Sequence, residues 1–167
     1  MPTFEKIVSR VDSADEGDDF LCKIIAGRKN NFLYVLDVLY TQDKMEITEK
    51  QCAELDLNNK TNYCTIESNN GGKLFAQNIA KRAKDIKNFL TRYSWKATTK
   101  NKQSRILSSA SGVNNVFIMP SDWRTRWPLF YNAMMTFTRK GKNKHDDAPD
   151  CITALYEDEF NNIKRGF

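Results

Sequence analysis

The C-terminal part of the sequence gathers residues whose types could do chemistry. Asp146, Asp147 and Asp150 lie beside His145, the only histidine of the chain, within six consecutive positions. Such close negative charge costs free energy through like-charge repulsion unless a cation or strong hydrogen-bond donors compensate it. One interpretation is a helix start, with Asp147 as the cap, Pro149 in the first turn and Asp150 favoured by the helix dipole. The other is a divalent-metal site, which requires partner carboxylates elsewhere in the chain.

Two acids far from this segment are candidates for those partners. Asp12 follows the apolar stretch 4–11 and Glu67 follows the stretch 61–66, so each is expected at the end of a strand. Carboxylates at neighbouring strand ends repel unless a hard cation such as Mg²⁺ or Mn²⁺ bridges them. Each acid also has a simpler role open to it: an Asx turn for Asp12, an ion pair for Glu67 and a helix cap for Asp147.

A site of this kind would hydrolyse phosphodiesters, because two bridged cations can activate water and stabilise the leaving oxygen. Either Asp18 or Asp19 could reach a second ion. His145 could activate water, bind metal or contact the scissile phosphate, or it could be a loop histidine bonded to a nearby carboxylate. The predicted catalytic residues are Asp12, Glu67, Asp147 and His145. The predicted metal ligands, for two expected ions, are Asp12, Glu67, Asp146, Asp147 and Asp18.

Positive charge is concentrated in two segments. Residues 81–105 hold nine Lys or Arg against a single acid, Asp85, and residues 139–144 add four more bases without an acid. Residues 12–19, in contrast, hold five acids and no base. Separate basic and acidic zones indicate a track for a polyanion beside a cation site, although each basic run could also be a solvated helix face. The predicted DNA-binding residues are Lys100, Lys102, Arg105, Arg139, Lys140, Lys142 and Lys144.

The elements that must position these residues follow from hydrophobic periodicity and turn signals. The expected strands are 4–12, 20–26, 31–40, 61–67, 92–97 and 113–119. The expected helices are 48–58, 73–90, 103–111, 121–137 and 147–164. This order predicts a mixed α/β fold, in which a three-stranded antiparallel meander comes first and helices flank a central sheet. It matches the order of a ribonuclease H-like fold.

Composition excludes several other classes. At 167 residues, with 40% apolar and 28% charged residues, the chain fits one soluble domain with its own core. No apolar run approaches the roughly 18 residues of a membrane span, and the N-terminus lacks the apolar segment of a signal peptide. Four widely spaced cysteines and one histidine argue against a zinc site or a disulfide framework, and indicate a reducing cytosol.

Three stretches carry a resemblance to a known family. They are Arg10–Ala14 with Gly17–Phe20, then Ile66–Gly72, and finally His145–Asp150. In order and spacing they resemble the C-terminal nuclease domain of the large terminase subunit of tailed bacteriophages, and the likeness covers nearly the whole chain. The family's first metal-binding aspartate then falls on Asp12, its central acid on Glu67, and its last acid on the pair Asp146 and Asp147. His145 matches a histidine found in part of the family.

The resemblance implies a ribonuclease H-like fold and an endonuclease, dependent on Mg²⁺ or Mn²⁺, that cuts concatemeric viral DNA during genome packaging. No GxxxxGK[ST] phosphate loop occurs in the sequence, so we expect residues 1–167 to be a single nuclease domain without an ATPase motor. The implied partners are double-stranded DNA, the terminase ATPase domain, the small terminase subunit and the portal, with no membrane. The implied location is the cytoplasm of the infected bacterial host.

Two other functions remain open. Another ribonuclease H-like nuclease, such as a Holliday-junction resolvase, would have a similar acidic site but would require a dimer. A non-catalytic DNA-docking module of a packaging complex would need the basic residues but would gain nothing from grouped acids beside them.

Overall fold

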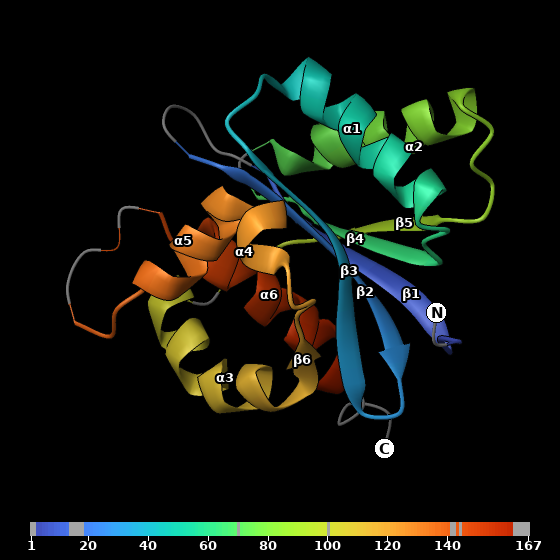
Figure 1. Ribbon diagram of the computed structural model, residues 1–167. Helices are drawn as coiled ribbons and strands as arrows, with labels where there is room; N and C mark the ends of the chain where they lie inside the picture. Colours follow the sequence, from blue (N-terminus) through green and yellow to red (C-terminus); the bar gives the residue numbers. More distant parts are fainter. Residues whose placement is uncertain are drawn as a thin grey trace.

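The described part of the chain folds around one mixed β-sheet. The computed structural model describes residues 3–13, 19–69, 71–99, 101–140, 143 and 145–161. In these residues, six strands form a sheet in the order β5-β4-β1-β2-β3-β6 (Figure 1). The strands are β1 (Lys6–Asp12), β2 (Leu21–Lys29), β3 (Phe32–Thr41), β4 (Tyr63–Glu67), β5 (Arg92–Lys96) and β6 (Phe117–Ile118).

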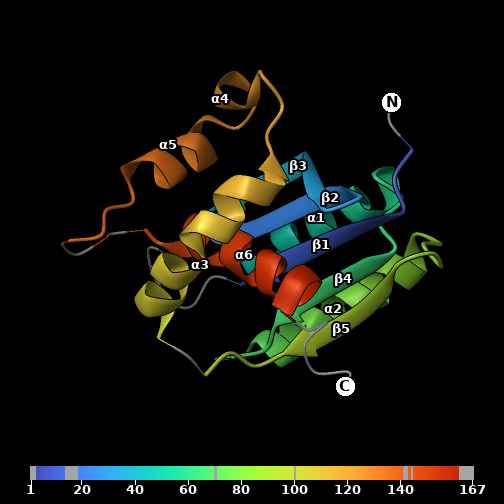
Figure 2. The same ribbon diagram turned by 90° about the horizontal axis from the view of Figure 1, so that it is seen from below.

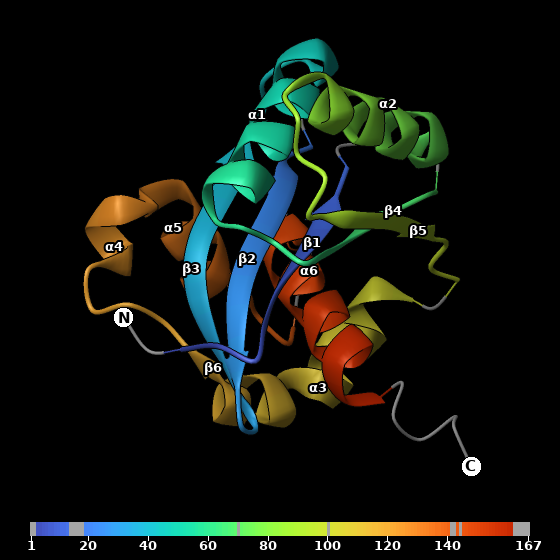
Figure 3. The same cartoon turned by 90° about the vertical axis from the view of Figure 1, so that its right-hand side faces the viewer.

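Helices cover both faces of this sheet. They are α1 (Met45–Asn58), α2 (Gly72–Asp85), α3 (Lys102–Val116), α4 (Trp123–Arg126), α5 (Pro128–Thr136) and α6 (Asp147–Tyr156), the last followed by a π-helical turn, η1 (Glu157–Asn161). Helices α1 and α2 lie on one face, and α3 and α6 lie on the other (Figures 1 and 3). Seen from below, α6 crosses the sheet in front of β1, with α3 packed against it (Figure 2).

The predicted antiparallel meander is confirmed. Strand β2 pairs antiparallel with both β1 and β3, from Lys6↔Arg28 to Asp12↔Cys22 on one side. Its hairpin with β3 turns at residues 30 and 31, where Asn30 adopts a left-handed backbone with a φ of 55°. Asparagine tolerates this conformation better than most residues, so the turn can be this short. Strand β2 therefore continues to Lys29, through most of the segment 27–30 that was predicted as the turn.

The pairing of β1 with β4 positions the site. These strands run parallel, with Val11 opposite Ile66. Neighbouring parallel strands end at the same edge of a sheet, so Asp12 and Glu67, the last residues of β1 and β4, lie side by side there. Side chains alternate between faces along a strand. Val11 and Ile66 therefore pack into the core beneath α1 and α2, and the two acids face α6.

Each face has its own hydrophobic core. The cluster on the α6 side includes Ile24, Leu33, Phe130 and Ile152, and the cluster on the α1 and α2 side includes Val11, Phe75 and Ile79. Helix α6 is buried along its whole length from Asp147 to Leu155. A helix enclosed in this way cannot move freely, so it holds its N-terminal aspartates firmly against the sheet edge.

Two predicted helices end earlier than their apolar patterns indicated. Helix α2 stops at Asp85 because Lys87 takes a left-handed φ of 62° and the Asn88 N–H bonds to the carbonyl of Ala83 at 2.8 Å. This is a Schellman motif, which satisfies the last carbonyls of a helix. The closing helix, predicted over 147–164, ends at Tyr156 before η1, and residues 162–164 lie outside the described part of the chain.

Two further elements differ from the sequence prediction. The helix predicted over 121–137 is divided into α4 and α5, because Pro128 at the start of α5 disfavours helical backbone at Trp127. The strand predicted over 113–119 is wrong in its first half. Val113 lies in α3 and packs into the core, and only Phe117 and Ile118 pair with β3. β-Branched residues at 113 and 116 favoured the strand interpretation.

Two further observations concern the helices and the cysteines. Among the described residues, no helix combines the length and apolar character that a membrane span requires. All four cysteines are buried, with free thiols.

Candidate metal centre

Three buried carboxylates meet at the edge of the sheet. Asp12 comes from the end of β1, Glu67 from the end of β4 and Asp150 from the first turns of α6. One oxygen of each lies within 4.8 Å of the others, and the residues are only 4%, 6% and 1% exposed. Burying three like charges together costs free energy that a bound cation would offset. This group could therefore hold a metal ion.

A second set of acids shares two members with the first. Asp19 and Asp147 join Asp12 and Glu67 around a small cavity of about 90 Å³. The Phe20 N–H donates to Asp147 Oδ2 at 3.2 Å, which fixes the carboxylate toward this cavity. The space is enough for a cation with a few of its waters. Asp12 and Glu67 therefore belong to both sets of acids.

Burial dominates the electrostatics of these carboxyl groups. Burial raises the pKa of Asp12 well above its ordinary value; the ammonium of Lys102 opposes the increase, and the charge of Glu67 adds to it. Burial also raises the pKa values of Asp147 and Asp150, although the Phe20 N–H and Lys102 oppose this at Asp147 and Arg105 opposes it at Asp150. The apo site is therefore short of positive charge.

Lys102 supplies part of that charge. Its Nζ lies 3.7 Å from Asp12 Oδ2, 3.8 Å from Asp147 Oδ1 and 3.6 Å from Asp150 Oδ2. Burial alone would lower the pKa of Lys102, but the three carboxylates raise it above its ordinary value. The side chain is 41% exposed, so the ammonium is reached from solvent and is not locked among the acids. It was predicted as a DNA-binding residue, and the structure places it over the acidic group.

The donor set fits a hard divalent cation. Asp12 Oδ2 is buried and has no hydrogen-bond donor among the described residues, so one oxygen at the centre of the group is left for another ligand. The grouped ligand atoms are all carboxylate oxygens, which suit Mg²⁺ and Mn²⁺ better than softer metals. The residues present therefore fit the cation that the sequence predicted.

Neighbouring side chains orient Glu67. The Asn69 amide donates to Glu67 Oε1 at 2.9 Å and to the Thr98 carbonyl at 2.7 Å. On the other side, Arg10 Nη2 lies 3.8 Å from Glu67 Oε2. The chain turns tightly between β4 and α2, because the Gly72 N–H bonds to the Asn69 carbonyl at 2.8 Å and Gly71 has a φ of 86°. Residue Asn70 lies outside the described residues.

Arg105 orients Asp150. Its guanidinium donates to Asp150 Oδ1, and its Nε lies 3.4 Å from Glu157 Oε2. Arg105 was predicted to bind DNA, and this stays a prediction; its side chain is 3% exposed and pairs with Asp150 inside the protein. A charged group so enclosed acts on its neighbour's position rather than on a ligand at the surface.

The structure brings together Asp12, Glu67 and Asp147 of the predicted site. Asp146 is the residue before α6, its carbonyl accepts the Asp150 N–H at 2.9 Å, and it belongs to neither acidic set. His145 packs edge-on against Phe20 and lines a neighbouring cavity. Asp18 lies outside the described residues. The catalytic and metal-binding roles of these residues remain predictions.

Sequence reasoning missed Asp150, Asn69 and the positioning role of Arg105. Asp150 was assigned only to the helix start, yet it lies three residues after Asp147, a spacing that puts both on one helix face. That spacing was a usable signal. Nothing in the sequence indicated that Asn69 would bond to the acid two positions before it.

Of the other predicted DNA contacts, Arg139 and Lys140 are exposed in the segment after α5. The Arg139 carbonyl accepts from Gln103 at 3.4 Å, which ties this segment to the start of α3. Lys100, Lys142 and Lys144 lie outside the described part of the chain. The exposed pair remains a candidate contact for a phosphate backbone.

Together, the sheet order and the acids at the ends of β1 and β4 and on α6 define a ribonuclease H-like nuclease fold. Residues 11–116 match the family model described as the terminase of bacteriophage T7, ribonuclease H-like domain. The chain belongs to this family. A comparison with curated proteins gave no match.

Solved structures share the fold at low sequence identity. The nuclease domain of the large terminase subunit of bacterial virus Sf6 is 9% identical, with a TM-score of 0.63 over 93% of this chain and 88% of that one. The manganese-soaked, inhibitor-bound terminase nuclease domain of human cytomegalovirus is 15% identical, with a TM-score of 0.63 over 95% of this chain and 85% of that one. The fowlpox virus Holliday junction resolvase is 11% identical, with a TM-score of 0.58 over 94% of this chain and 99% of that one.

Proposed function

We propose that this chain is a metal-dependent endonuclease that cuts double-stranded viral DNA concatemers during genome packaging, with little sequence preference. The observation that carries the proposal is the group of three buried carboxylates, Asp12, Glu67 and Asp150, whose oxygens lie within 4.8 Å of one another. Membership of the terminase family supports the nuclease role. The manganese-soaked cytomegalovirus domain supports the choice of cation.

The residues of this chain have distinct tasks in the proposed reaction. Asp12, Glu67 and Asp150 would hold one cation, and Asp147 and Asp19, which line a cavity with Asp12 and Glu67, could help to hold a second. When bound, such cations supply Lewis-acid stabilisation of the attacking and leaving oxygens of a phosphodiester. Asn69 and Arg105 keep Glu67 and Asp150 in place. Lys102, whose side chain is 41% exposed and whose ammonium lies beside the acids, would contact the phosphate of the bound strand.

Low sequence preference is expected because the basic side chains near the acids are suited to contact the DNA backbone. Lys102, and the exposed Arg139 and Lys140, are suited to contact phosphate oxygens, which carry no sequence information. We propose the terminase ATPase domain, the small terminase subunit and the portal as partners. We propose the cytoplasm of the infected bacterium as the location.

Plasmid cleavage tests the nuclease proposal. Supercoiled DNA is incubated with Mg²⁺, Mn²⁺ or EDTA and with the wild type, Asp12→Asn, Glu67→Gln or Asp150→Asn. We expect nicking that needs the cation and falls by at least about 100-fold in each variant, since each removes a charged ligand. Asp43→Asn, an exposed acid in the loop before α1, is the matched control and should cut like the wild type. Equal activity in the wild type and all three site variants would contradict the assignment.

A Holliday-junction resolvase is the second candidate, favoured by the likeness to the fowlpox virus enzyme over 99% of that chain. The same preparation distinguishes the two. A terminase-type nuclease should cut linear duplex and four-way junctions at similar rates. A resolvase should cut the junction far faster and in symmetric pairs of strands. DNA binding without any cleavage would favour the docking module.

A further inference from the structure

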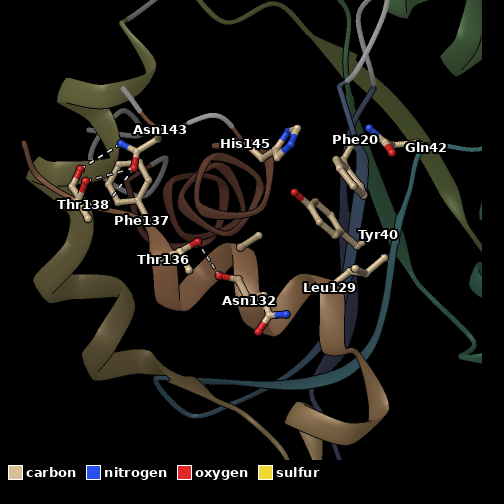
Figure 4. Close-up of a pocket in the computed structure, with 11 residues that line it drawn as sticks. Phe20, Tyr40, Gln42, Leu129, Asn132, Thr136, Phe137, Thr138, Asn143 and His145 are labelled. Carbon is tan, nitrogen blue, oxygen red and sulfur yellow. Dashed lines mark hydrogen bonds between the residues drawn. The ribbon is translucent and has the colours of Figure 1, made fainter. Parts of the chain in front are cut away.

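A second cavity adjoins the acidic site and is not used by the proposed hydrolysis. It has a volume of about 630 Å³ and lies between α5, the residue before β2, the end of β3 and the segment before α6 (Figure 4). This volume falls within the roughly 300–1,000 Å³ of sites that take small organic groups. Phe20, Tyr40, Asn132, Thr136 and His145 are among the residues that line it.

One wall of the cavity is aromatic. The rings of Phe20 and Tyr40 stack with centroids 4.4 Å apart and an angle of 9° between their planes. His145 meets the Phe20 ring edge-on at 5.1 Å. In Figure 4, the Tyr40 hydroxyl points into the space between His145 and helix α5. A wall of this kind offers flat apolar surfaces to a planar ligand.

The cavity also holds polar atoms without partners. Tyr40 Oη and His145 Nδ1 are buried, and neither has a hydrogen-bond partner among the described residues. Buried polar atoms are usually satisfied, so two unpartnered ones on residues that line one cavity indicate a ligand with its own donors and acceptors. Asn132 and Thr136 on α5 add an amide and a hydroxyl to the lining.

The cavity is joined to the acids through Phe20. The Phe20 ring forms part of the aromatic wall, and its backbone N–H donates to Asp147 Oδ2 at 3.2 Å. His145 precedes Asp147 by two residues. A strand whose phosphate lies at the acids would therefore have a neighbouring nucleotide at the mouth of this cavity.

We propose that the cavity binds one unpaired nucleobase of the DNA strand being cut, next to the scissile phosphate. A base is the planar part of DNA that carries hydrogen-bond donors and acceptors on its edge, as the wall and the unpartnered atoms require. Stacking on aromatic rings tolerates every base, so the subsite agrees with low sequence preference. This inference rests on the proposed function for the identity of the substrate.

Binding measured without metal tests the subsite apart from catalysis. Fluorescence anisotropy in EDTA compares a fully paired duplex with the same duplex carrying one unpaired thymine. The wild type should bind the second duplex about tenfold more tightly, the usual scale of one stacked base. Thr136→Trp, which places an indole ring in part of the cavity, and Tyr40→Leu, which removes one ring of the stacked Phe20–Tyr40 pair, should each bring the ratio of the two dissociation constants close to one.

Met135→Trp is the matched control, because Met135 is the exposed neighbour of Thr136 on α5 and does not line the cavity. It should keep the wild-type ratio. A wild-type ratio near one would overturn the proposal. It would also be overturned if both Thr136→Trp and Tyr40→Leu kept the wild-type ratio, or if Met135→Trp lost the preference as fully as they do. Failure of the nuclease proposal would instead appear as absent plasmid nicking, which leaves this ratio unaffected.

Discussion

At the scale of single residues, Asp12 is the centre of the site. It belongs to both acidic sets, and its Oδ2 is buried without a hydrogen-bond donor among the described residues. An acid in this environment lowers the stability of the apo protein, because folding removes its charge from water. The same shortage of donors leaves it available to a cation. Function and stability therefore oppose each other at this residue.

That conflict predicts how Asp12→Asn changes stability. Because burial raises the pKa of Asp12 in the folded state, the native protein binds more protons than the unfolded chain between the unfolded value of about 3.9 and the raised value. The free energy of unfolding in EDTA should therefore fall as pH rises through this window. Asp12→Asn should remove that contribution and, at pH 7, raise the melting temperature by about 2–4 °C for roughly 1 kcal/mol.

Thermal unfolding followed by circular dichroism between pH 4 and 8 measures this effect. Asp43→Asn, whose acid is exposed, is the control and should follow the wild-type curve. An Asp12→Asn protein that is less stable than the wild type at neutral pH in EDTA would show that the carboxylate is well satisfied without metal.

At the scale of elements, the turn between β4 and α2 sets the position of Glu67. A Cβ on Gly72 would collide with the carbonyl oxygen of Glu67. Helix α2 can therefore begin directly beside the sheet edge that carries Glu67 only because residue 72 has no side chain. The requirement at Gly72 is one of backbone packing.

Gly72→Ala should therefore damage both the fold and the site. The added methyl must displace either α2 or the end of β4, so we expect a loss of about 2 kcal/mol in the free energy of unfolding and weaker cation binding at Glu67. Urea titration and manganese titration measure the two effects. Lys73→Ala, at the next and exposed position, should change neither. A Gly72→Ala variant with wild-type stability would refute the packing requirement.

The elements also show what the sequence could and could not predict. The apolar stretches before Asp12 and Glu67 predicted that each acid ends a strand. The turn between the second and third strands predicted the antiparallel meander. The spacing of Asp147 and Asp150 put both on one helix face, but which of them would join Asp12 and Glu67 could not be predicted, because it depends on how α6 rotates and packs against β1. The end of α2 depended on a left-handed residue, Lys87, which is not a residue type that signals such a turn.

At the scale of the whole molecule, a buried ion pair supports the face of the sheet opposite the site. Lys23 Nζ lies 2.9 Å from Asp56 Oδ1, and both side chains are fully buried. Burial alone would lower the pKa of Lys23, but Asp56 raises it above its ordinary value. Ser9 and Tyr93 donate to the Asp56 carboxylate at 3.0 and 3.1 Å. The network links β1, β2, β5 and α1.

Removing one partner of this pair should be costly. Asp56→Asn leaves the Lys23 ammonium buried without a counter-charge, and we expect a loss of about 3–5 kcal/mol in the free energy of unfolding. The double variant Lys23→Met with Asp56→Leu should recover much of it, since an apolar pair needs no solvation. Urea unfolding measures all three proteins. A single variant that unfolds at the wild-type urea concentration would show that the pair contributes little.

The most direct measurement of the central claim is the location of a bound cation. Crystals soaked in Mn²⁺ and measured at the manganese absorption edge would show bound ions as anomalous difference peaks. We predict a peak bonded to oxygens of Asp12, Glu67 and Asp150. Its absence, at a manganese concentration that supports plasmid nicking, would contradict the assignment of this acidic group as the metal centre.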